Sequence, residues 1–104
     1  MIVKTSTLTG DTLDRLVSHC KEWSKPFPIM PLRILSYSTD WNQGGPIIDR
    51  ERIATQFWVS EGEWEALIKG GFFASRGPTP LIAAMRCYVT SVLGDEVEIP
   101  EEFL

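Results

Sequence analysis

Residue types that commonly carry out catalysis or bind metals are scarce in this chain, which has one histidine, His19, and two cysteines, Cys20 and Cys87. A zinc site usually needs four Cys, His or carboxylate ligands, or three with an open position. His19 and Cys20 are neighbours in a helical pattern, where adjacent side chains point about 100° apart and form no nucleophile and base pair. We therefore expect no metal, no cofactor and no enzymatic activity, with His19 on the surface and both thiols buried in a reducing compartment.

Three carboxylates at alternate positions, Glu61, Glu63 and Glu65, have the chemistry of general acids and bases. They fall at a predicted turn and along one face of a predicted strand. We interpret them as a solvated face of the protein.

Two segments, Gly44-Gly45-Pro46 and Gly77-Pro78-Thr79-Pro80, are typical of helix starts. Free backbone N–H groups and the positive end of the helix dipole attract anions there. Arginines lie near both segments, and a tryptophan stands in the polar stretch before the first. The candidate ligand-binding residues are Trp41, Gly44, Gly45, Arg50, Thr79 and Arg86.

Structural interpretations of the same residues stay open. Glycine and proline are routine at helix starts without any ligand. A loop tryptophan can fold onto its own domain, and the guanidinium of Arg86 can form an ion pair with Asp40 or Asp49.

The elements that position these residues are predicted by hydrophobic spacing. Apolar residues recur at helical intervals from Leu13 to Cys20 and from Leu81 to Val92. They predict amphipathic helices from Gly10 to about Glu22 and from Pro80 to Gly94, with Thr9 and Thr79 as N-caps. Between them we expect an extended connector with Pro26, Pro28 and Pro31, a strand over residues 32–37, a loop over residues 38–45 and a brief helix starting at Pro46.

Alternating residues over 54–59 and 64–68, on either side of a Ser60-Glu61-Gly62 turn, predict a β-hairpin. The alternative is a helix, since Ser60 and Glu63 match a capping box. Trp58 points away from Phe57 on such a strand, so at least one of Trp41 and Trp58 should be partly exposed. The predicted fold is α+β, with two amphipathic helices packed on one face of a small antiparallel sheet.

The chain has 104 residues, 43% of them hydrophobic, as expected for one small domain. The net charge of −4 comes from acids near the end, where Asp95, Glu96, Glu98, Glu101 and Glu102 have no basic neighbour. We expect a single domain over residues 1–94 and a solvated acidic tail over residues 95–104. A nearly neutral body lacks the positive field that nucleic-acid binding needs, and no apolar run is long enough to span a membrane.

The segments STDWNQGGPIIDRE at 38–51 and GPTPLIAAMRCYV at 77–89, followed by GDEVEIPEE at 94–102, resemble the NinX-like phage and prophage proteins. LTGDTLD at 8–14 fits the opening of that family. The resemblance implies a small accessory protein in the cytoplasm of a bacterial host, encoded near recombination or early-regulation genes. The family has no assigned activity and lends no catalytic residue.

The leading hypothesis is a non-enzymatic module that binds a small anionic, nucleotide-like ligand, such as a signal of host defence. Trp41 would stack on the ligand, and the helix starts and Arg86 would receive its phosphate. The alternative is a protein interaction module that inhibits or redirects a host or phage protein through an exposed aromatic patch, aided by the acidic tail. A homodimer with a shared site suits either hypothesis.

Overall fold

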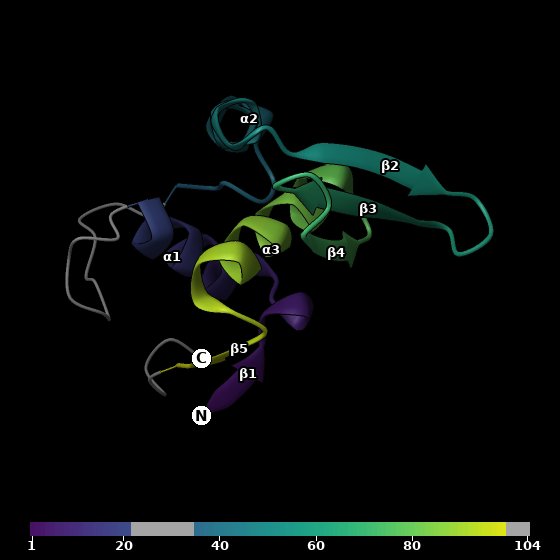
Figure 1. Cartoon of the computed structure of the whole chain (residues 1–104). Coiled ribbons are helices and arrows are strands. Elements are labelled where there is room, and N and C mark those ends of the chain that lie inside the picture. Colours follow the sequence, from purple (N-terminus) through teal and green to yellow (C-terminus); the bar gives the residue numbers. More distant parts are fainter. Residues whose placement is uncertain (22–34, 100–104) are drawn as a thin grey trace.

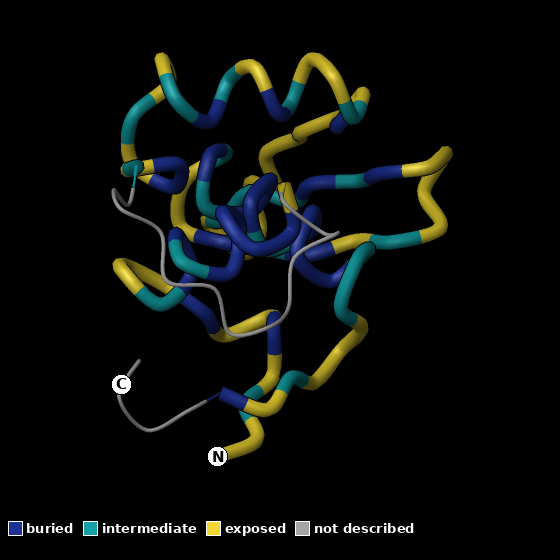
Figure 2. The backbone as a smooth tube through the Cα atoms, turned by 90° about the vertical axis from the view of Figure 1, so that its left-hand side faces the viewer, coloured by how far each residue is buried: buried dark blue, intermediate teal, exposed yellow. Residues whose placement is uncertain are grey.

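The computed structural model describes residues 1–21 and 35–99. Within these ranges it has three α-helices, one antiparallel sheet of three strands and one of two (Figure 1). The predicted α+β class is confirmed. Buried residues gather at the centre of the molecule, with exposed segments around them (Figure 2). In the described ranges no helix has the length and apolar character needed to cross a membrane.

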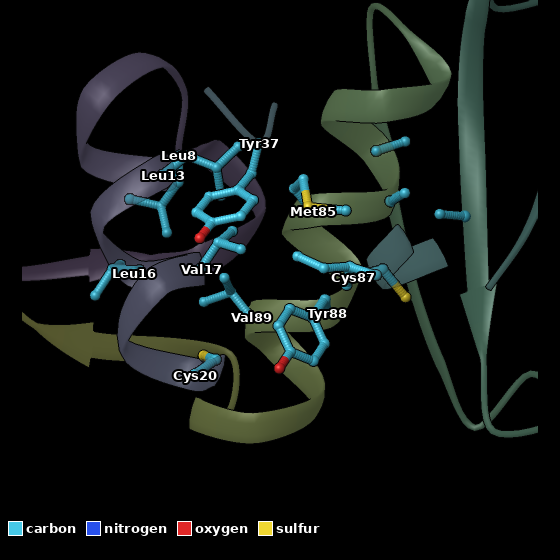
Figure 3. Packing of buried hydrophobic residues seen from close by; sticks show 14 of the residues in the cluster. Leu8, Leu13, Leu16, Val17, Cys20, Tyr37, Met85, Cys87, Tyr88 and Val89 are labelled. Carbon is cyan, nitrogen blue, oxygen red and sulfur yellow. The ribbon is translucent and has the colours of Figure 1, made fainter. Parts of the chain in front are cut away.

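Helix α3 (Pro80–Leu93) is the centre of the fold, because it is buried on two sides. One side lies on the three-stranded sheet, where the Cys87 thiol is 3.5 Å from the backbone oxygen of Phe73. The other side packs against helix α1, so the apolar side chains of the two helices face each other (Figure 3). Both predicted ends of α3 are confirmed, and Gly94 follows its last turn.

The N-cap of α3 contributes measurable stability. The Thr79 hydroxyl accepts a hydrogen bond from the backbone N–H of Ile82 at 3.1 Å. We expect Thr79→Ala to lower the free energy of unfolding by about 1 kcal/mol, because this N–H loses its acceptor, and Thr79→Ser to be nearly neutral. Denaturant unfolding measures both variants. Equal losses would mean that the threonine methyl group, rather than the cap, stabilises the helix start.

The predicted start of helix α1 (Gly10–Lys21) at Gly10 is confirmed, and its predicted end at Glu22 lies outside the described residues. Its expected apolar stripe is buried: Leu13, Leu16, Val17 and Cys20. Both cysteine thiols are buried as predicted, and burial raises the pKa of Cys20 to about 12.

The prediction that His19 is a surface residue is wrong, because its exposed fraction is only 3%. The apolar stripe indicates one covered side of α1, but residues 16–20 are all buried, so the helix is covered over more of its circumference. Desolvation lowers the pKa of His19, since burial disfavours the charged imidazolium.

Strands β2 (Ala54–Trp58), β3 (Glu63–Ile68) and β4 (Phe73–Gly77) form the larger sheet in that order, all antiparallel. The β2–β3 hairpin is confirmed and the alternative helix is wrong. Phe57 lies opposite Trp64 across this hairpin. Strand β4 is not predicted by the alternation pattern. It pairs with β3 and makes the hairpin part of a sheet that α3 covers.

The smaller sheet brings the two ends of the described chain together. Strand β1 (Ile2–Lys4), followed by a 3-10 turn, η1 (Thr5–Thr7), pairs antiparallel with β5 (Glu96–Glu98). Ile99 is completely buried. The expectation of a solvated tail is therefore wrong for residues 95–99. Val97 and Ile99 alternate there with the acids. The strand therefore turns its apolar side chains toward the body of the protein and its carboxylates toward water.

The predicted loop over residues 38–45 is wrong from Trp41 onward, because helix α2 (Trp41–Glu51) begins there. The Asp40 carboxylate accepts a hydrogen bond from the backbone N–H of Asn42 at 2.9 Å and caps the helix. An aspartate whose side chain accepts a hydrogen bond from a nearby backbone N–H occurs both in turns and at helix starts. The two glycines that follow Asp40 are more typical of a turn, which is why the sequence predicts a loop. Pro46, predicted to open the helix, lies inside it.

The strand predicted over residues 32–37 is wrong in its described part, since residues 35–37 belong to no strand. Residues 32–34 and the proline connector lie outside the described residues. Tyr37 and Ser38 are buried and lead directly into the start of α2.

Candidate functional site

The starts of α2 and α3 meet at a shallow pocket of about 200 Å³. Trp41 and Thr79 both line it, so two of the six candidate ligand residues come together. The other lining residues are Ser38, Thr39, Leu81 and Ile82. Trp41 is 55% exposed, which confirms that at least one tryptophan lies partly in solvent. The pocket therefore offers an aromatic ring beside two helix N-termini.

The charge around this pocket does not favour a phosphate group. The positive ends of two helix dipoles point toward it. The N-cap side chains of Asp40 and Thr79 already accept hydrogen bonds from backbone N–H groups of the first turn of each helix. One of these N-caps, Asp40, is a carboxylate. Among the residues that the structure describes, none that lines the pocket is a lysine, arginine or histidine. The pocket is thus better suited to a flat or apolar group than to a highly charged anion.

Gly44 and Gly45 do not form the predicted helix start, because both lie inside α2. Gly44 is buried where the helix crosses the chain before it. A Cβ at this position would lie 2.2 Å from the backbone oxygen of Tyr37 and 2.7 Å from Cδ1 of Leu81. Gly44 therefore permits a close approach of backbones and presents no free N–H groups at a helix start.

Arg50 lies in the last turn of α2 and is not among the residues that line the pocket. Its Nε donates to Glu51 Oε2 at 2.8 Å, and its Nη2 donates to the Tyr88 hydroxyl at 3.2 Å. The bond to Glu51 raises the pKa of Arg50. These contacts connect the end of α2 to α3, which is a structural role.

Arg86 connects three parts of the fold through two backbone carbonyls. Its Nε donates to the oxygen of Leu8 at 2.7 Å, and its Nη1 donates to the oxygen of Arg76 at 2.8 Å. The suggested ion pair with Asp40 or Asp49 is wrong, because backbone oxygens occupy the guanidinium. Burial lowers the pKa of Arg86, since desolvation disfavours its charge.

Removal of the Arg86 guanidinium should destabilise the protein. We expect Arg86→Ala to lower the free energy of unfolding by about 3 kcal/mol, because two partly buried carbonyls lose a charged donor. Arg86→Lys should recover only part of this loss, since an ammonium group lacks the planar fork that reaches both oxygens. Denaturant midpoints test the pair of variants. A loss from Arg86→Ala below about 1 kcal/mol would argue against this structural role.

A second candidate surface lies on the β2–β3 hairpin, which projects from the body of the molecule (Figure 1). Phe57 and Trp58 are 48% and 39% exposed, and Val59, at the start of the turn, is 85% exposed. The Phe57 and Trp64 rings contact each other with centroids 5.3 Å apart. We call these four residues, Phe57, Trp58, Val59 and Trp64, the aromatic arm.

Polar side chains on the outer face of the hairpin hold each other in place. Glu65 accepts hydrogen bonds from Gln56 Nε2 at 2.8 Å and Trp58 Nε1 at 3.1 Å, and these bonds lower its pKa. Arg76 lies 3.2 Å from Glu63 and 3.7 Å from Glu65, with its guanidinium over the Trp58 ring. Both carboxylates are thus engaged with an arginine or with hydrogen-bond donors. Their arrangement is that of a cross-strand network on a solvated face.

None of the exposed apolar residues on the hairpin is among the six residues that the sequence predicts to bind a ligand. The signal that identifies them is the run Phe57-Trp58-Val59, since consecutive apolar residues in a strand point to both faces. One helix covers only one face of a sheet, so part of such a run must remain exposed. Of the residues that the structure describes, no group of three or more His, Cys, Asp or Glu side chains could hold a metal ion.

Comparison with known proteins places the chain in a family. A family model described as "Bacteriophage P22, NinX" matches residues 4–92, a range that contains the pocket and the aromatic arm. A search among curated proteins finds no match. The match covers most of the chain and confirms the resemblance of residues 38–51 and 77–89. The chain therefore belongs to the NinX family of phage proteins.

Proposed function

We propose that this phage protein is a non-enzymatic accessory protein that acts by binding another protein through the aromatic arm. The observation that carries the proposal is the exposure of Phe57, Trp58 and Val59 on a hairpin that projects from the core. Aromatic residues are enriched in protein interfaces, and exposed apolar clusters usually mark a surface with a function. The partner is a host or phage protein in the bacterial cytoplasm, a reducing compartment that suits two buried free thiols.

The arm supports protein binding better than the pocket supports nucleotide binding. Small-molecule sites usually measure about 300–1,000 Å³. The pocket beside Trp41 has about 200 Å³, and none of its lining residues within the described ranges is cationic. Arg86, which the nucleotide hypothesis assigns to phosphate, donates to two backbone oxygens instead. Arg50, another candidate ligand residue, donates to Glu51 and Tyr88.

Paired variants test the protein-binding proposal. Val59→Ser removes an apolar side chain from the arm, and Phe72→Ser removes an equally exposed one, at 80%, from the turn between β3 and β4. Tagged wild type and both variants are recovered from phage-infected cells, and the bound proteins are quantified by mass spectrometry. A partner retained by Phe72→Ser and lost with Val59→Ser supports the proposal. Identical recovery with all three proteins contradicts it.

Capture of a small nucleotide-like ligand, such as a host-defence signal, is the second candidate, since Trp41 and Thr79 share one pocket. A ligand present at 100 times its Kd should add about 2.7 kcal/mol of stability. A thermal-shift screen against linear and cyclic nucleotides therefore detects binding. A stabilisation abolished by Trp41→Ala supports this function, and no shift with any nucleotide excludes the class.

A further inference from the structure

Strand β2 is an open edge of the larger sheet. Within the described part of the chain, the strand order β2-β3-β4 leaves it with one neighbour (Figure 1). All five of its residues are exposed. Edge strands are normally protected by charged residues, proline, a bulge or a covering element. The sequence of β2, Ala-Thr-Gln-Phe-Trp, contains no charge and no proline. An unprotected edge with exposed aromatic residues is suited to pairing with another strand.

A second copy of the same strand is complementary to this edge. In a two-fold antiparallel pairing with Gln56 opposite its own copy, each Trp58 lies opposite an Ala54, and each Phe57 opposite a Thr55. Each bulky ring then meets a small side chain. Within one chain Ala54 is followed across the sheet by Leu67 and Ala74. The partner's Trp58, whose ring leans toward Glu65 and Arg76 of its own chain, would therefore lie beside Ala54 without a clash.

Electrostatics permit this pairing. The edge is neutral, and the nearest carboxylate on its outer face, Glu65, is engaged with Arg76. In the paired sheet the two copies of Glu65 are separated by three strand spacings, or about 14 Å. That distance exceeds the screening length of about 8 Å at physiological salt, so the like charges repel each other weakly.

We infer that two copies of this chain pair through β2, in antiparallel register about Gln56, to form a continuous six-stranded sheet. The inference rests on the proposed function of the arm as an interaction surface and names its first occupant as a second copy. The dimer places the two aromatic arms on opposite sides of the two-fold axis, with their tips pointing in opposite directions. The outer face of the combined sheet, which α3 does not cover, remains available to another protein.

Charge substitutions at the two-fold axis test the inference. Wild type at about 100 μM should have twice the mass of one chain by light scattering, as it does when the Kd of the dimer is well below this concentration. Gln56→Lys and Gln56→Glu each place two like charges opposite one another and should be monomeric. An equal mixture of the two variants should form a heterodimer. Gln56→Lys keeps a partner for Glu65, so loss of folding does not explain its monomeric state.

Matched controls are Asn42→Lys and Asn42→Glu, which make the same charge changes on the exposed surface of α2 and should stay dimeric. Hydrogen exchange supplies a second measurement, with amides of residues 54–58 protected in the wild type but not in Gln56→Lys. A monomeric wild type, a dimer that persists in both charged variants, or a mixture without heterodimer overturns the inference. The recovery experiment with Val59→Ser reads out the other partner separately, so failure of either proposal is distinguishable.

Discussion

Gly44→Ala should strongly destabilise the protein. A Cβ at this position would lie 2.2 Å from the backbone oxygen of Tyr37 and 2.7 Å from Leu81 Cδ1. The leucine end can rotate away, but the carbonyl belongs to the buried segment that leads into α2. Relief therefore requires α2 to move away from its neighbours. We expect a loss of at least about 3 kcal/mol, above the usual range for overpacking, from a total that is typically 5–15 kcal/mol.

The neighbouring glycine is the matched control. Gly45 is in the same helix, and the nearest atom to an added Cβ, in the Trp41 ring, is 3.9 Å away, which is ordinary contact. Gly45→Ala should stabilise the protein by about 0.5–1 kcal/mol, because alanine loses less backbone entropy in a helix. Thermal and denaturant unfolding measure both variants. Similar effects at the two positions would contradict the close packing of α2 against the backbone at Tyr37.

The sequence predicts those elements whose periodicity extends over several turns or residues. The stripe of α3 continues from Leu81 to Val92, and the hairpin alternates on both sides of its turn, so each pattern outweighs local exceptions. The first half of helix α2, before Pro46, escapes prediction because it contains two glycines ahead of the proline. These residues are costly in a helix, but Asp40 caps it, and Gly44 is required by packing that only the folded chain shows.

The candidate site is predictable only in part, because contacts between distant segments decide it. Trp41 and Thr79 share a pocket, as two helix starts near each other allow. Arg86 donates to Leu8, 78 positions away in the sequence, and no local pattern indicates that pairing. Its place at the margin of an apolar stripe fits a structural and a ligand-binding role equally. The run Phe57-Trp58-Val59 of the aromatic arm can be recognised in the sequence. Its exposure cannot, because it depends on how much of the sheet α3 covers.

The acidic segment after Gly94 is part of the folded structure, so its removal should be costly. β5 supplies the only pairing partner of β1 among the described residues. The Asp95 carbonyl accepts hydrogen bonds from the backbone N–H of Thr5 at 2.9 Å and from the Thr5 hydroxyl at 3.1 Å. Ile99 is completely buried, and burial of such a side chain stabilises a protein by about 1.5–3 kcal/mol.

Truncation after Gly94 should therefore lower the free energy of unfolding by more than about 4 kcal/mol, the combined loss of the Ile99 side chain and the bonds to Thr5. The matched comparison is a chain that ends after Ile99, because the difference between the two isolates residues 95–99. Ile99→Ala in the full chain should account for about 2–4 kcal/mol. Glu98→Ala should be nearly neutral, because this exposed carboxylate makes a surface ion pair with the N-terminus. Equal stability of the two truncated chains would show that β5 rests on the body without stabilising it.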